Sequence, residues 1–147
     1  MSKIERFMRE GNRSLVLRHL RKMKNPERVL EAFGNRHDLH IEAYGRLLEL
    51  QPLSREVVKK LSQHLETELY ATGPWRWVHL TQLIAKNGDA SHIPILEKAL
   101  EQADTDAALA DTGEEQDHQR ASLARHYADE IESHLKLLQK RVQEEPK

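Results

Sequence analysis

The 147-residue sequence contains no cysteine, which excludes disulfide bonds and thiolate chemistry and suits a reducing compartment. It has no apolar run that approaches the length of a membrane span. Its first residues, MSKIERFMRE, are charged and lack the apolar region of a secretory signal. We therefore expect a soluble cytoplasmic protein without a membrane partner.

Motifs for catalysis are missing as well. The sequence has no glycine-rich phosphate loop, no G-x-S-x-G and no H-E-x-x-H, and its six glycines are scattered, most of them at predicted turns. Carboxylates are numerous, but an acid/base pair needs two of them in different environments inside a cleft, and spacing alone selects no such pair. We expect a protein that is not an enzyme, with no catalytic residue and no cofactor.

Charge is distributed unevenly although the formal net charge is only −1. Residues 1–36 carry ten Lys and Arg against four Glu, whereas residues 101–119 carry seven Asp and Glu and no Lys or Arg. Such asymmetry is typical of a polar contact surface, and equally of a solvated helix face and a solvated loop. The near-neutral total weakens non-specific attraction to a polyanion.

Apolar spacing of three and four recurs along the chain, and sustained strand-like alternation does not occur. The pattern predicts one all-α domain over residues 1–147. Asn25 caps a helix that has Pro26 in its first position, and Val58, Leu61 and Leu65 form a narrow apolar stripe. The predicted helices are 3–9, 13–24, 26–33, 38–50, 55–71, 74–87, 91–103 and 114–144, with an acidic loop at 104–113 and a frayed tail at 143–147.

Short turns between these helices favour antiparallel neighbours. The pairs would be 26–33 with 38–50, 55–71 with 74–87, and 91–103 with 114–144. We expect a short right-handed stack of helical hairpins closed at one end by the long last helix, and an irregular helical bundle is the alternative.

The segment NGDASHIPILEKALEQADTD, residues 87–106, resembles the unit of HEAT-like helical repeats. A Gly-Asp turn is followed by a proline in the first helical turn and then by Leu and Ala on the buried side. The resemblance implies stacked helical hairpins that present a concave surface to proteins or nucleic acids. Because some HEAT-like proteins are enzymes, the fold by itself does not settle activity.

The stretch TGPWRWVHL contains both tryptophans, Trp75 and Trp77, on either side of Arg76. In a helix the two indoles lie about 200° apart, so one flat core face does not accommodate both. Either the helix is central and buries them against different neighbours, or Trp75 at its start stays exposed beside Arg76 and anchors a partner. Of the two, Trp75 is the one we expect to be exposed, because the first turn lies at the edge of the stack.

Nine histidines are many for this length. On the last predicted helix, His126, Glu130 and His134 are spaced by four and could ligate a divalent metal. Three residues on one straight helix rarely complete a tetrahedral shell, so surface histidines beside carboxylates are the simpler interpretation, and we expect no metal.

Together these features favour a non-catalytic protein-interaction module, acting as an adaptor, a regulator or an inhibitor such as a toxin-neutralising immunity protein. The alternative is a nucleic-acid-binding helical-repeat protein that uses its basic N-terminal helices. The charge asymmetry also allows pairing between copies, so the oligomeric state stays open. The candidate partner-binding residues are Arg18, Arg21, Lys22, Trp75, Arg76, Asp104, Asp106, Asp111, Glu114 and Glu115.

Overall fold

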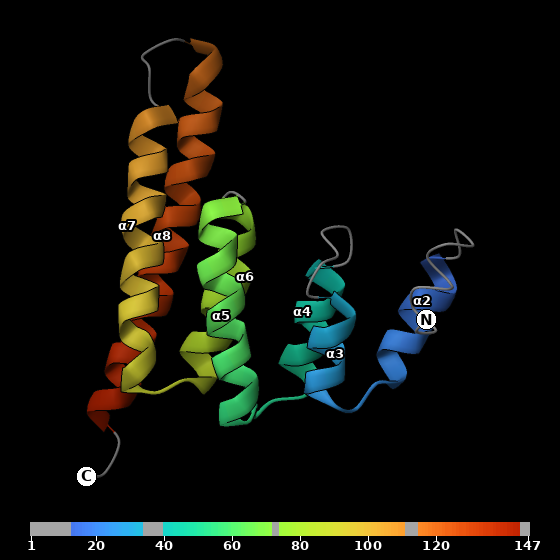
Figure 1. Cartoon of the computed structure of the whole chain (residues 1–147). Helices are drawn as coiled ribbons and strands as arrows, with labels where there is room; N and C mark the ends of the chain where they lie inside the picture. The colour runs from blue at the N-terminus through green and yellow to red at the C-terminus, as the bar shows by residue number, and fades with distance from the viewer. Residues whose placement is uncertain (1–12, 34–39, 72–73, 111–114, 145–147) are drawn as a thin grey trace. The chain divides into compact units, whose positions relative to one another are not determined.

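The computed structural model describes residues 13–33, 40–71, 74–110 and 115–144 (Figure 1). Within these ranges it contains seven α-helices and one short 3₁₀ helix, and no strand, which confirms the all-α prediction. The chain divides into two compact units, Met1–Val57 and Val58–Lys147, with the boundary near the start of helix α5 (Arg55–Ala71), and the single domain stays a prediction.

The described residues of unit 1 form three short helices. Their apolar faces bury Val16, Leu20, Val29, Leu30 and Leu47, and α4 packs against both α2 and α3. The Asn25 side chain caps α3 by accepting a hydrogen bond from the Glu27 backbone N–H at 3.0 Å, as predicted. The bounds are α2 Arg13–Lys22, α3 Pro26–Phe33 and α4 His40–Glu49.

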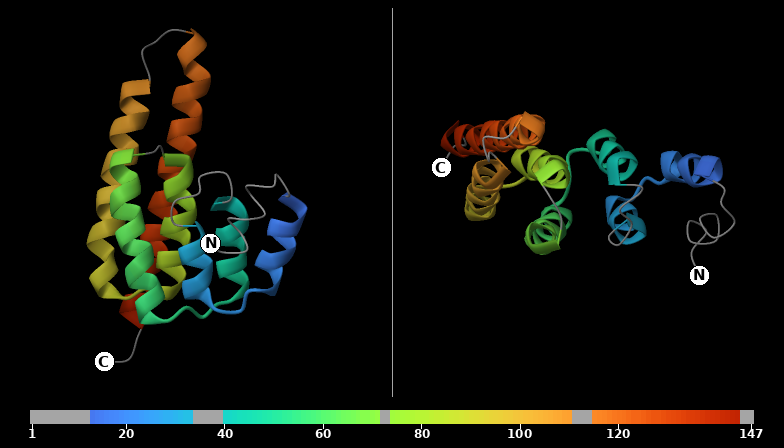
Figure 2. Two further views of the ribbon diagram at one scale, coloured as in Figure 1. Left: turned by 45° about the vertical axis from the view of Figure 1, so that its right-hand side comes forward. Right: turned by 90° about the horizontal axis from the view of Figure 1, so that it is seen from above.

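Unit 2 contains longer helices, and α8 packs against both α6 and α7. Figures 1 and 2 show α7 and α8 side by side along most of α7. Ala99, Ala103 and Ala107 form the buried stripe of α7, and these small side chains let α8 approach closely. After α5, the elements of this unit are α6 Pro74–Asn87, a 3₁₀ helix Ala90–His92, α7 Ile93–Ala110 and α8 Glu115–Glu144.

The carboxyl end of α6 is stabilised by a hydrogen bond from α8 and is followed by a tight turn at Gly88. Arg141 of α8 donates a hydrogen bond to the Ala85 carbonyl, which as a late helix carbonyl has no partner within the helix. Gly88 follows α6, and a Cβ added there would lie 2.6 Å from the Ile84 carbonyl oxygen. Only glycine therefore fits this turn without a shift of the backbone.

Away from the acidic segment, the described helix bounds lie within two residues of the sequence prediction. The helix predicted for 91–103 begins with a 3₁₀ turn and continues to Ala110, so the loop prediction was wrong for residues 104–110. Ala107 continues the buried stripe one turn beyond Ala103, and packing on α8 outweighs the acidic character of the segment. Residues 143 and 144 are helical, whereas the predicted helix 3–9 and residues 111–114 and 145–147 lie outside the described ranges.

Two of the three expected helix pairs are in contact, since α3 packs on α4 and α7 packs on α8, whereas α6 packs more extensively on α8 than on its expected partner α5. The stacked superhelix and its likeness to HEAT repeats stay predictions. In the described ranges, no helix combines the length and the apolar character that a membrane span requires.

Candidate protein-interaction site

The two tryptophans of α6 have different environments. Trp77 is 3% exposed and its indole N–H donates a hydrogen bond to the Glu68 carbonyl of α5 at 3.0 Å. Trp75 is 43% exposed. This confirms that Trp75 is the more exposed of the pair, and it places a large aromatic side chain at the surface of unit 2.

Arg76 was expected at the surface as a partner-binding residue, but its side chain is buried. It is 2% exposed, and its Nη1 lies 3.2 Å from Oε2 of Glu68, which is itself buried. Burial lowers the pKa of Arg76, yet a guanidinium keeps its proton in proteins, so the pair is ionic. The earlier prediction that Arg76 contacts a partner was therefore wrong, because the side chain crosses to α5 and its charge is used inside unit 2.

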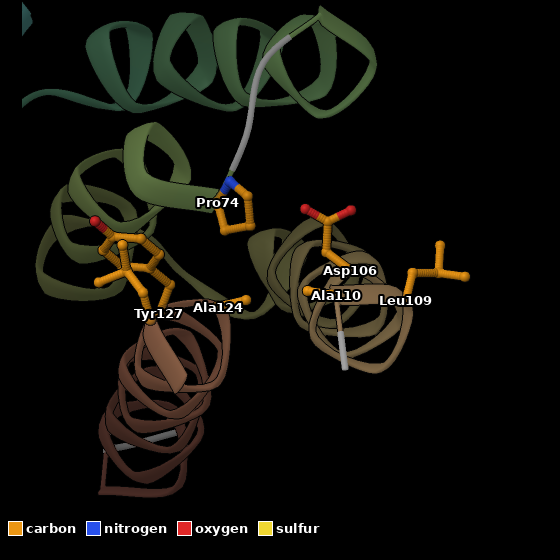
Figure 3. A pocket seen from close by; sticks show the side chains of 7 residues that line it. Pro74, Asp106, Leu109, Ala110, Ala124 and Tyr127 are labelled. Atoms are coloured by element: carbon orange, nitrogen blue, oxygen red, sulfur yellow. The ribbon is translucent and has the colours of Figure 1, made fainter. Parts of the chain in front are cut away.

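An apolar cleft lies where the start of α6 meets the carboxyl end of α7 and the third and fourth turns of α8 (Figure 3). Its volume is about 290 Å³. Figure 3 shows Asp106 and Tyr127 around the opening and Leu109 on the outer side of α7. Its lining consists of Pro74, Asp106, Leu109, Ala110, Leu123, Ala124 and Tyr127.

A second cleft, of about 500 Å³, lies beside the first, among α5, α6 and α7. Asp106 lines both cavities, so they meet at one residue of α7. We call the two cavities together the α7 cleft. The second part is more polar and is lined by Leu69, Trp77, Lys98, Glu101, Gln102, Thr105 and Asp106.

The charged groups of the α7 cleft are not balanced. Lys98 donates a hydrogen bond to the Tyr70 hydroxyl at 2.9 Å and lies 5.0 Å from the centre of that ring. Within the described residues, neither Asp106 nor Glu101 has an ion-pair partner for its carboxylate. The cleft thus combines an apolar wall with exposed negative charge.

The structure separates the acidic candidates. Asp104 is exposed on α7 and pairs with Arg125 of α8 at 2.7 Å, so its charge is partly used within unit 2. Asp106 is exposed on the same helix and lines the α7 cleft. Asp111 and Glu114 lie outside the described residues, and Glu115 begins α8.

The basic candidates Arg18, Arg21 and Lys22 are exposed on α2 of unit 1. Trp75, by contrast, belongs to unit 2. Lys22 lines a cavity of about 460 Å³ at the turn between α2 and α3. Four of the six residues that line it are lysine, arginine or histidine. The full lining is His19, Lys22, Met23, Lys24, Asn25 and Arg28.

His126 and His134 of α8 do not converge on a metal site. His126 Nε2 lies 2.9 Å from Glu130 Oε1 at the surface, whereas His134 turns toward α6 and its Nδ1 lies 2.9 Å from the Thr81 hydroxyl. The Thr81 hydroxyl donates its proton to the Val78 carbonyl, so it accepts from Nδ1–H of His134. No group of three His, Cys, Asp or Glu side chains in the described ranges is placed to hold a metal ion.

Sequence reasoning missed the apolar part of the α7 cleft. Leu123 and Tyr127 belong to the periodic stripe of α8, which reads as core, yet Leu123 is 52% exposed. Leu109 is 73% exposed and was assigned to the acidic loop. The available signal was an isolated leucine between Asp106 and Asp111, since a solvated acidic loop has no need of one.

Comparison with protein-family models, with curated proteins and with solved structures finds no match for this chain.

Proposed function

We propose that the protein is a non-catalytic protein-interaction module, and that it docks a partner protein at the α7 cleft. The observation that carries the proposal is that two exposed leucines, Leu109 and Leu123, line one apolar cavity. Trp75, which is 43% exposed, directly follows the lining residue Pro74 in the sequence. Exposed leucines occurring singly need no explanation, but several at the rim of one cavity are typical of interaction sites. An exposed tryptophan is among the residues most enriched at binding hot spots.

An adaptor, a regulator and a dedicated inhibitor all use such a surface, and we propose that this chain belongs to one of these classes. The absence of cysteine supports action in a reducing compartment such as the cytoplasm. The resemblance of residues 87–106 to HEAT-like repeats supports the same role, because stacked hairpins serve mainly as binding surfaces.

A pull-down from native lysate tests the proposal, with a parallel sample treated with nuclease. Full-length wild type should retain a protein in both samples. Leu123→Ser should lose it, because burying an exposed leucine contributes about 1.5–3 kcal/mol to an interface. Trp75→Ala should also lose it, and its urea midpoint should fall less than for a fully buried tryptophan, since Trp75 is 43% exposed.

Leu137→Ser is the matched control, because Leu137 is an exposed leucine of the same helix that does not line the α7 cleft. The proposal predicts that Leu137→Ser retains the partner. Equal retention by Leu123→Ser and Leu137→Ser would refute docking at this cleft.

The second candidate function is nucleic-acid binding by unit 1. The supporting observation is the cavity between α2 and α3, where Lys22, Lys24 and Arg28 gather and where none of the described lining residues is acidic. Its turn is braced, since Arg46 of α4 donates to the Met23 carbonyl at 2.9 Å. A rigid basic concavity would bind phosphate groups of a strand, with affinity that falls as salt rises.

Fluorescence anisotropy with a labelled oligonucleotide separates this candidate from the first. If unit 1 binds phosphates, the double variant Lys22→Ala, Arg28→Ala should weaken binding and flatten its dependence on salt. Lys59→Ala changes an exposed lysine of α5 that lies outside the cavity and should have little effect. Equal behaviour of the two variants would remove this candidate.

A further inference from the structure

We infer that the α7 cleft recognises a peptide segment of the partner in which a large apolar side chain lies next to a lysine or arginine. This inference rests on the proposed function and adds the chemistry of the partner. It is carried by the position of Asp106, which lines both cavities of the cleft.

The apolar half of the cleft selects the apolar side chain. Its lining includes Pro74, Ala110, Ala124 and the ring of Tyr127, and apolar surface continues outward to Leu109 and Leu123. A surface that extends beyond a cavity of about 290 Å³ suits a polypeptide, whose neighbouring residues cover the rim, better than a small molecule enclosed by the cavity.

The second, more polar cavity of the α7 cleft favours a positively charged side chain of the peptide. Asp106 and Glu101 are both exposed and have no ion-pair partner among the described residues, and Lys98 of the same cleft is held at Tyr70. An apolar side chain seated in the first cavity would bring its neighbour in the peptide to Asp106. A cationic neighbour then gains a charge-assisted hydrogen bond at the edge of a low-dielectric surface, whereas an anionic one is repelled.

The probe we would use is a phage-displayed library of random 12-residue peptides, selected on immobilised full-length protein. Recovered peptides should combine a large apolar residue with an adjacent Lys or Arg. Synthetic copies of the best sequences should bind Leu123→Ser about tenfold more weakly. Asp106→Asn should weaken them moderately and Asp106→Lys about tenfold or more, because the last change replaces attraction by repulsion.

Asp129→Lys is the matched charge reversal, since Asp129 is exposed on α8 and does not line the cleft. Its effect on peptide binding should stay within about twofold, the size of a screened long-range term. Selection repeated on Asp106→Lys should recover fewer basic peptides. Peptides without enrichment in Lys or Arg, or equal losses for Asp106→Lys and Asp129→Lys, would overturn the inference.

Two results separate this inference from the proposed function. A lysate partner that is lost with Leu123→Ser but retained by Asp106→Lys would leave the docking site standing and refute the basic-segment chemistry. Sedimentation that shows a dimer at micromolar concentration, converted to monomer by Leu123→Ser, would assign the cleft to a second copy and overturn the inference.

Discussion

The two units of the chain illustrate two ways of stabilising helices. The three described helices of unit 1 contain 10, 8 and 10 residues, whereas α7 and α8 of unit 2 contain 18 and 30. Isolated helices of about ten residues are marginal in water, so those of unit 1 depend on caps and cross-links such as the Asn25 cap and the Arg46 bond to Met23. Unit 2 instead relies on long buried stripes between α6, α7 and α8.

The two units also differ in where they place charge. In unit 1 the basic side chains Arg18, Arg21 and Lys22 are exposed. In unit 2 one cation, Arg76, is buried with Glu68, and acidic side chains line the surface cleft. The comparison shows that neighbouring residues in a sequence, such as Trp75 and Arg76, can serve opposite purposes, one at the surface and one in the core.

The largest expected effect is the loss of stability when the buried ion pair of unit 2, Arg76 with Glu68, is broken. Arg76→Ala leaves the Glu68 carboxylate buried without its guanidinium and should lower the free energy of unfolding by about 3–5 kcal/mol. Urea unfolding followed by tryptophan fluorescence measures this, and because both tryptophans lie in unit 2 the signal reports on that unit.

The control for this prediction removes both charges. Glu68→Leu with Arg76→Met should recover most of the loss, since apolar pairs of similar volume often replace buried ion pairs without cost. A single Arg76→Ala variant within about 1 kcal/mol of wild type would contradict the buried pair.

Replacing one glycine in each unit by alanine should change the stability of the two units in opposite directions. Gly88→Ala in unit 2 should destabilise by about 1–3 kcal/mol, because its Cβ would lie 2.6 Å from the Ile84 carbonyl oxygen. Gly45→Ala in α4 of unit 1 should stabilise by about 0.5–1 kcal/mol, because its Cβ meets nothing within 4 Å and alanine favours helix. Circular dichroism during urea unfolding follows both variants, and changes of the same sign would argue against the turn geometry at Gly88.

The smallest expected effect is a loss of folding stability as the pH falls. Burial lowers the pKa of His134 below its ordinary value of 6.5, and of the charges near it Glu130 opposes this while Lys86 and His79 add to it. The unfolded chain therefore binds a proton more readily than the folded one, and stability present above pH 6.5 is lost as the pH falls through the lowered pKa. Burial also lowers the pKa of His64, and the negative charge of nearby Glu68 opposes this shift.

Urea midpoints measured from neutral to mildly acidic pH test the effect at His134. The wild-type midpoint should fall more steeply than that of His134→Gln, whose side chain does not titrate. His126→Gln is the control variant, because it replaces a mainly exposed histidine of the same helix that lies beside Glu130. Identical slopes for wild type and His134→Gln would contradict the burial of His134 against Thr81.

Much of the fold could be predicted from local patterns. The bounds 55–71 and 74–87 agree with α5 and α6, and the last helix begins within one residue of its predicted start. Apolar periodicity and the residues that cap helices act within a few residues of chain, so a sequence reader can use them. The continuation of α7 through Asp104 and Asp106 was missed, because the α8 surface that supports it is distant in sequence.

The sequence by itself determined the helical class, the cap at Asn25 and Pro26, and the exclusion of disulfide and thiolate chemistry. Only the tertiary structure decided that Arg76 is buried against Glu68, that Trp75 is exposed, and that Leu109, Leu123 and Asp106 meet at one cleft. The physical reason is that helix formation depends on neighbours along the chain. Burial and charge pairing depend on which helix packs against which, and local spacing does not specify that choice.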